Sequence, residues 1–149
     1  MREAALALLS RRRYTEAEVA SRLARKGYEE GEIAEAVAWL RELRYLDDGA
    51  IARESAALAA RKHAGPARVA ARLRARGLDR KTIAGASDEA FEGVDLKASA
   101  RAALRKRFGR SDLVDAGPAE RKRASNFLFR MGFDWDTIRT VMKSDDADE

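Results

Sequence analysis

The segment VAARLRARGLDRKTIAGAS, residues 69–87, has the pattern of two short helices separated by a glycine. Apolar residues recur three or four positions apart before and after Gly77, which is the spacing of one helix face. A glycine directly after such a run favours the left-handed backbone that ends a helix. Gly65 and Pro66 precede the segment, and proline suits the first helical position because its missing N–H would be unpaired there. The segment therefore predicts a helix, a glycine stop and a second helix.

Two other segments repeat this pattern. VASRLARKGYEEGEIAEAV (19–37) and ASNFLFRMGFDWDTIRTVM (124–142) align with it when Gly27, Gly77 and Gly132 are superimposed. A leucine stands four positions before each glycine and an isoleucine six positions after it, and the glycines lie 50 and 55 residues apart. These shared positions are expected to form hydrophobic cores.

Capping residues mark where the predicted helices begin. Thr15 and Glu18 have the spacing of a capping box, in which each side chain bonds the other residue's free backbone N–H. Gly117, again followed by proline, lies fifteen residues before its stop glycine instead of twelve, so the third copy is nearly one turn longer. Another helix precedes each copy, and Asp48 is predicted to cap the one that runs to about residue 63.

The sequence therefore predicts an all-α protein, built as three tandem three-helix repeats that form an elongated, modular chain. The repeats are expected over residues 1–44, 47–88 and 95–144, with an acidic tail at 145–149. The segment 88–95 is the predicted linker. Because about 45 residues make only a small core, neighbouring repeats should support one another.

Several function classes are excluded by what the chain lacks. It has no cysteine and only one histidine, His63, and it has no glycine-rich phosphate loop. We expect no catalytic residues, no metal and no cofactor, and hence no enzyme. The first apolar run, residues 4–9, is too short for a signal peptide, and no run approaches the ~20 apolar residues of a membrane span. A cytoplasmic protein is expected.

The positive charge is concentrated in two stretches. The net charge is +5, with eight bases against one acid in residues 61–81 and six bases against none in 97–111. Such asymmetry indicates an anionic partner.

Two rows of cations are predicted to be the binding residues. Spacing of four residues places Arg68, Arg72 and Arg76 on one helix face, where like charges destabilise a helix by about 0.2–0.5 kcal/mol per pair. An anion across the row would offset that cost, and arginine matches phosphates and carboxylates. A simple solvated face is the alternative. The anion-binding, DNA-binding or filament-binding candidates are Arg68, Arg72, Arg76, Lys97, Arg101, Arg105, Arg61 and Lys62.

Three aromatic residues are candidates for protein contact: Trp39, Phe127 and Phe129. Trp39 lies off the apolar stripe of its helix, and the two phenylalanines flank Leu128. In the third repeat the face equivalent to Arg68, Arg72 and Arg76 is largely apolar. That difference predicts a protein contact for the third repeat and an anion contact for the second, with core packing as the alternative role of these rings.

The chain resembles the RecX family of RecA regulators. The resemblance rests on ALALLSRRRYTEAEVASRLARKGY (5–28), YLDDGAIAR (45–53), GPARVAARLRARGL (65–78) and RASNFLFRMGF (123–133), which occur in the family's order. It implies tandem three-helix repeats that bind RecA filaments in their deep groove, and that suppress strand exchange, ATP hydrolysis and repressor cleavage during DNA repair, recombination and the SOS response. It also implies binding to single- and double-stranded DNA.

Two other functions remain open from the residues alone. Short helix–glycine–helix units are also typical of helix-turn-helix transcription regulators that bind a specific duplex sequence. A pure protein-interaction scaffold with solvated arginines is the third hypothesis, and it predicts no DNA binding at low salt. The chain is expected to be a monomer.

Overall fold

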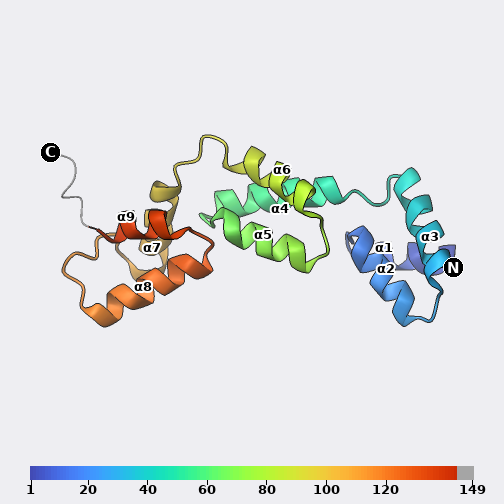
Figure 1. The fold of residues 1–149 in the computed structure, drawn as a ribbon, viewed down its shortest axis with the longest axis horizontal. Coiled ribbons are helices and arrows are strands. Elements are labelled where there is room, and N and C mark those ends of the chain that lie inside the picture. The colour runs from blue at the N-terminus through green and yellow to red at the C-terminus, as the bar shows by residue number, and fades with distance from the viewer. Residues whose placement is uncertain (144–149) are drawn as a thin grey trace.

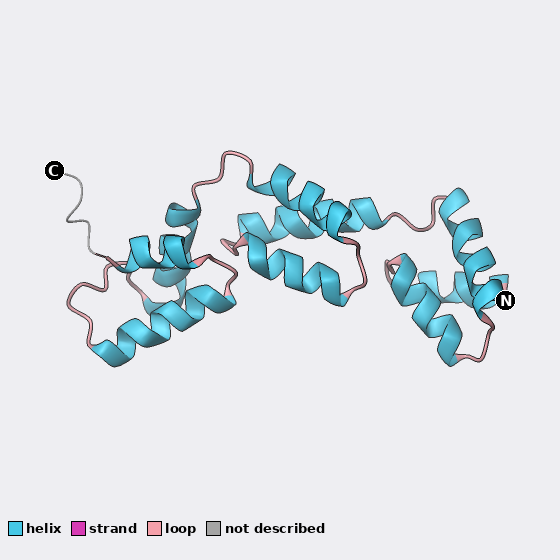
Figure 2. Cartoon of the chain, viewed as in Figure 1, coloured by secondary structure: helices cyan, strands magenta, loops and turns pink. Residues whose placement is uncertain are grey.

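A computed structural model describes residues 1–143, and these residues form helices and no strand (Figures 1 and 2). The helices are α1 (Arg2–Leu9), α2 (Glu16–Arg25), α3 (Glu30–Glu42), α4 (Asp48–Arg61), α5 (Pro66–Ala75), α6 (Arg80–Phe91), α7 (Leu96–Phe108), α8 (Pro118–Arg130) and α9 (Trp135–Met142). None of them has the length and apolar character needed to cross a membrane.

The helices group into three modules, each with its own hydrophobic core. Module 1 (α1–α3) packs around Val19 and Leu23, and module 2 (α4–α6) around Val69 and Leu73. Module 3 (α7–α9) packs around a core that includes Leu128. Figure 1 shows the modules one after another along an elongated molecule. The prediction of an all-α chain of tandem three-helix repeats is confirmed.

The residue boundaries of the repeats stay predictions, and position 144 and the acidic tail at 145–149 lie outside the described residues. The linker prediction is wrong in extent, because α6 continues to Phe91 instead of ending near residue 88. Ala90 and Phe91 pack against the module 2 core, which keeps this part of the chain helical. Only a short turn then separates α6 from α7.

Local capping works as predicted at α2 but differs at α4. The Thr15 side chain accepts the Glu18 N–H at 3.1 Å and the Glu18 carboxylate accepts the Thr15 N–H at 3.0 Å, so the capping box is confirmed. The N-cap of α4 is Asp47, whose carboxylate accepts the Ala50 N–H at 3.0 Å, not Asp48. Asp48 instead accepts the Glu16 N–H at 3.0 Å, so it caps α2 of the neighbouring module.

The stop glycines adopt the predicted left-handed backbone, with φ of +92° at Gly27, +82° at Gly77 and +94° at Gly132. Helix α4 ends at Arg61, and His63 takes a positive φ of 58° after it. Gly65 is the N-cap of α5 and Pro66 its first residue, as the sequence predicts.

The middle helices of successive modules meet head to tail. At the first junction, Arg76 and Gly77 after α5 contact Thr15, Ala17 and Glu18 at the start of α2; for example, the Thr15 hydroxyl donates to the Arg76 carbonyl at 2.7 Å. The aligned helix dipoles add a small favourable term.

The second junction has the same plan with different groups. Met131 and Gly132, after α8, contact Gly65, Ala67 and Arg68 at the start of α5. The Gly65 N–H donates to the Met131 carbonyl at 2.7 Å, and the Ala67 N–H donates to the Gly132 carbonyl at 3.1 Å. Backbone hydrogen bonds therefore hold this junction, whereas side-chain charges contribute to the first.

Candidate anion-binding surface

Helix α5 presents its arginines because of how it packs. Val69 and Leu73 are buried in the module 2 core, which leaves Arg72 exposed and Arg68 half-buried on the flank of the helix. The Arg68 guanidinium lies 3.1 Å (Nη1) from the Met131 sulfur across the second junction. Packing thus fixes the direction of the first two members of the predicted row.

A groove of about 460 Å³ runs between modules 2 and 3 beside this row. We call it the basic groove. Five of its lining residues are cationic, and no acidic residue of the described part of the chain lines it. The cations are Lys62, Arg68, Arg72, Arg76 and Lys106, and the apolar floor comprises Leu58, Ala59, Val69, Leu73 and Met131.

The basic groove depends on the second junction. Lys106 belongs to α7 and Met131 follows α8, so module 3 supplies both residues to a surface built mostly by α4 and α5. The residue spacing on α7 had predicted Arg105 as a binding residue, not its neighbour Lys106. The structure therefore brings Lys62 beside the predicted row of Arg68, Arg72 and Arg76 and adds Lys106, a cation that spacing alone did not single out.

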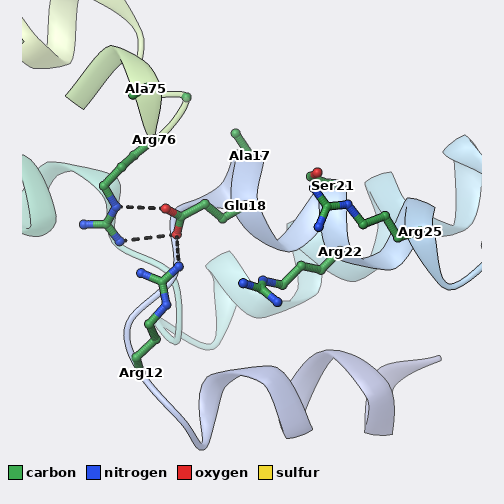
Figure 3. A pocket seen from close by; sticks show the side chains of 9 residues that line it. Arg12, Ala17, Glu18, Ser21, Arg22, Arg25, Ala75 and Arg76 are labelled. Carbon is green, nitrogen blue, oxygen red and sulfur yellow. Dashed lines mark hydrogen bonds and ion pairs between the residues drawn. The ribbon is translucent and has the colours of Figure 1, made fainter. Parts of the chain in front are cut away.

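Arg76, the third member of the row, is paired within the molecule. Its Nε lies 2.8 Å from Glu18 Oε1, its Nη2 lies 3.3 Å from Oε2, and Nη2 also donates to the Arg13 carbonyl at 3.2 Å (Figure 3). The hydrogen bond from Arg76 to Glu18 is the main cause that raises the pKa of Arg76. Glu18, 58 positions earlier, is therefore an intramolecular partner for Arg76, so the charge of this member of the row is offset without an external anion.

A second pocket of about 230 Å³ lies at the first junction (Figure 3). We call it the arginine pocket, since Arg12, Arg22, Arg25 and Arg76 line it together with one acid, Glu18. Sequence reasoning missed Arg12, Arg22 and Arg25. The repeat alignment contained one signal, because Arg22 and Arg72 both stand five positions before their stop glycine.

The remaining predicted cations lie away from both pockets. Lys97 and Arg105 are exposed on α7, and Arg105 Nη1 lies 3.4 Å from Ser111 Oγ. Arg101 is half-buried and lines a separate cavity of about 50 Å³ with Ser111 and Leu113. Arg61 is exposed at the end of α4. The second predicted row therefore does not join the basic groove.

The aromatic candidates divide into packed and exposed rings. Phe127 packs against the module 3 core and meets Phe108 edge-on at 5.7 Å between ring centroids, so core packing describes it better than a free contact surface. Trp39 is half-buried against the module 1 core, with the Arg2 guanidinium 4.7 Å from its ring centroid. Phe129 is 54% exposed and stacks on Trp135, which is 52% exposed.

Among the described residues no group of three or more histidine, aspartate or glutamate side chains could hold a metal ion. The arrangement of both pockets, with clustered guanidinium groups beside modest apolar surface, suits the binding of an anionic macromolecule.

Family models match at both ends of the chain. The description "RecX, first three-helix domain" matches residues 2–40, and "RecX, third three-helix domain" matches residues 95–142. The chain is 37% identical to the regulatory protein RecX of Halorhodospira halophila, over 100% of this chain and 90% of that protein. It is 38% identical to the regulatory protein RecX of Chlorobaculum tepidum, over 93% and 84%.

Solved structures have the same fold. The crystal structure of RecX from Lactobacillus salivarius superimposes with a TM-score of 0.74 at 21% identity, covering 95% of this chain and 91% of that one. A second crystal structure, of a regulatory protein RecX, gives 0.77 at 20% identity, covering 94% and 70%.

Proposed function

The chain belongs to the RecX family of regulatory proteins, and from this membership we propose that it regulates the RecA recombinase without catalysing a reaction itself. It binds RecA filaments on DNA, lies along the groove of the filament, and lowers strand exchange, ATP hydrolysis and RecA-stimulated repressor cleavage. Contact with single- and double-stranded DNA is an accessory part of this binding.

The basic groove is the observation that carries the proposal. Five cations line it, no acid among residues 1–143 does so, and its floor is apolar. A nucleoprotein filament offers both phosphates and carboxylates for such a rim, and protein side chains for such a floor. The groove therefore accommodates a target that is anionic and partly apolar.

The elongated shape adds to this support. Three modules in a row (Figure 1) can contact successive subunits of a filament, and linked weak contacts strengthen one another through effective concentration. If binding favours an inactive filament, the population shifts away from the active one. The exposed Phe129–Trp135 pair on module 3 supplies an aromatic surface for the protein part of this contact.

Co-sedimentation with preformed filaments of the cognate RecA, across a salt series, tests the proposal. We expect Arg72→Glu to weaken binding about 10-fold, or about 1.4 kcal/mol, because Arg72 is exposed on the groove rim. Arg74→Glu is the matched control, since Arg74 is exposed on the same helix but does not line the groove. Equal loss in both variants would contradict the role of the groove.

The ATPase rate of RecA gives the functional readout. We expect slower DNA-dependent ATP hydrolysis at substoichiometric amounts of the protein, and no effect at one protein per RecA monomer contradicts the proposal.

Comparing binding to random and to selected duplexes tests the alternative of a transcription regulator, which requires a preference of roughly 10³-fold or more for one duplex sequence.

A further inference from the structure

The arginine pocket carries more positive charge than its own acid neutralises. Four guanidinium groups and a single carboxylate, Glu18, line it. That carboxylate is already shared, because Arg76 Nε lies 2.8 Å from Oε1 and Arg12 Nη2 lies 3.7 Å from Oε2. Figure 3 shows Arg12 and Arg76 reaching Glu18 from different segments, while Arg22 and Arg25 extend from α2.

A buried tyrosine holds two of these arginines in place. Tyr14 is 5% exposed, and the guanidinium carbons of Arg12 and Arg22 lie 4.3 and 5.0 Å from its ring centroid. A guanidinium over the face of an aromatic ring is attracted by the negative charge of the ring face. Two long side chains are thereby ordered before any ligand arrives, which lowers the entropic cost of binding.

Arg22 and Arg25 make no ion pair with a carboxylate within residues 1–143. Both stand in the last turn of α2, where a cation also stabilises the helix end. That role does not require them to share a pocket with Arg12 and Arg76, which come from a loop and from another module.

Arg76 lines the arginine pocket and the basic groove, so the two cation-lined pockets adjoin at the end of α5. Adjoining cationic pockets match a polymer with regularly spaced charges better than a single acidic side chain. We propose that the arginine pocket is a phosphate-binding subsite for a nucleic-acid backbone, with Arg22 and Arg25 as its principal ligands. This inference rests on the accessory DNA binding of the proposed function and assigns it a place at the first junction.

The test uses the full chain and a 5′-fluorescein-labelled (dT)15, with binding measured by fluorescence anisotropy from 50 to 300 mM NaCl. Each phosphate contact on a single strand contributes about −0.7 to the log–log salt slope. We therefore expect Arg22→Gln/Arg25→Gln to bind about 10-fold more weakly at 50 mM salt and to reduce the steepness of the slope by about 1.4.

The control variant Arg74→Gln/Arg80→Gln removes the same charge from exposed positions outside both pockets. We expect its slope to change by less than about 0.5. Arg22→Lys/Arg25→Lys keeps the charge at α2, so it should keep the wild-type slope; it also covers the case in which the glutamine variant folds poorly. Equal slopes for the glutamine variant and the control overturn the proposal.

Two further probes identify the ligand chemistry. An oligothymidylate of the same length with neutral methylphosphonate linkages should bind wild-type and Arg22→Gln/Arg25→Gln protein equally. Polyglutamate should compete with (dT)15 equally well in both proteins, and competition that depends on Arg22 and Arg25 would identify the pocket as a carboxylate site.

The outcome is separable from that of the proposed function. If the glutamine variant binds (dT)15 like the wild type while RecA co-sedimentation persists, the subsite is wrong and the regulatory function stands. If wild-type protein fails to bind RecA filaments, yet its salt slope on (dT)15 is steeper than that of Arg22→Gln/Arg25→Gln, the subsite stands and the regulatory function is wrong.

Discussion

Glu18 has two tasks at the start of α2. Its carboxylate closes the capping box with Thr15, and it binds Arg76 of the next module through two hydrogen bonds. Burial raises the pKa of Glu18, but the hydrogen bonds from Arg76 and Thr15 and the charges of Arg76 and Arg12 outweigh it. The pKa therefore lies below its ordinary value of 4.5.

The lowered pKa of Glu18 determines how the stability of the first junction changes with pH. A carboxyl with a folded-state pKa below 4.5 contributes its full stability above pH 4.5, and that contribution is lost as pH falls through the lower, folded-state value. The first junction should therefore weaken in acid. Asp48 contributes to stability in the opposite direction. Burial raises its pKa, so protonation in acid removes the free-energy cost of keeping a buried charge.

We expect Arg76→Gln to raise the pKa of Glu18, since the favourable partner is lost while desolvation remains. NMR titration of the Glu18 carboxyl carbon measures this directly. At pH 7 the same change should weaken the first junction by about 1 kcal/mol, the size of one charge-assisted hydrogen bond at a partly exposed position. Arg74→Gln is the control, and an unchanged Glu18 titration in Arg76→Gln would refute the assignment.

Arg22 and Arg72 illustrate what residue patterns can and cannot predict. Their equivalent positions before Gly27 and Gly77 are visible in the repeats, so a search for cations in register could have found Arg22. Arg12 gave no such signal. It lies in a loop, and only the fold places its guanidinium beside Glu18 and over Tyr14.

At the scale of elements, the stop glycines do more than end helices. Gly27 and Gly132 have nearly the same φ, +92° and +94°, but their surroundings differ. A Cβ at Gly27 would meet nothing within 4 Å, whereas one at Gly132 would overlap the Arg68 backbone nitrogen. The same local motif thus serves as a helix end in module 1 and as a contact surface in module 3.

The different surroundings of Gly27 and Gly132 allow a comparison of two alanine variants, one at each glycine. Gly27→Ala should cost only the left-handed strain of a non-glycine residue, about 1–2 kcal/mol. Gly132→Ala should cost that strain and also separate the second junction, losing two backbone hydrogen bonds worth about 0.5–1.5 kcal/mol each. Urea denaturation compares the two losses, and amide hydrogen exchange at Gly65 and Ala67 reports the junction.

Equal destabilisation of the two glycine variants, with unchanged exchange at Gly65 and Ala67, would show that the second junction contributes nothing to stability.

The greater length of α8, which has 13 residues where α2 and α5 have 10, was predictable from the wider spacing before Gly132. The N-cap of α4 was misassigned because Asp47 and Asp48 are chemically identical neighbours, and only the position of Glu16 in the fold gives Asp48 its separate role.

At the scale of the whole molecule, the two junctions differ in what holds them. The first contains the Glu18–Arg76 pair and the exposed Arg13–Glu54 pair at 2.5 Å. The second is held by backbone hydrogen bonds and the Arg68–Met131 contact. Salt screens exposed charges, with a Debye length of about 3 Å at 1 M, and hardly affects backbone hydrogen bonds.

We therefore expect high salt to loosen the first junction and to leave the second unchanged. Spin-label distance measurements can check this without interference, because the chain has no native cysteine. The pair Ala24→Cys and Ala71→Cys, exposed on α2 and α5, spans the first junction, and Ala71→Cys with Asn126→Cys spans the second. The first distance distribution should broaden at 1 M NaCl. Broadening of both distributions, or of neither, would contradict the assignment.

The sequence by itself determined the helices, their glycine stops and the threefold repeat, because caps, stops and apolar spacing act between residues a few positions apart. Only the tertiary structure decided which cations are available. Arg76 is paired by a glutamate 58 positions earlier, Lys106 joins the basic groove from another module, and Arg12 and Arg22 share Tyr14. The first two arrangements depend on the angles between modules, which are set by contacts between residues about 60 positions apart, and such contacts leave no periodic trace in the chain. The third depends on how the loop after α1 packs beside α2.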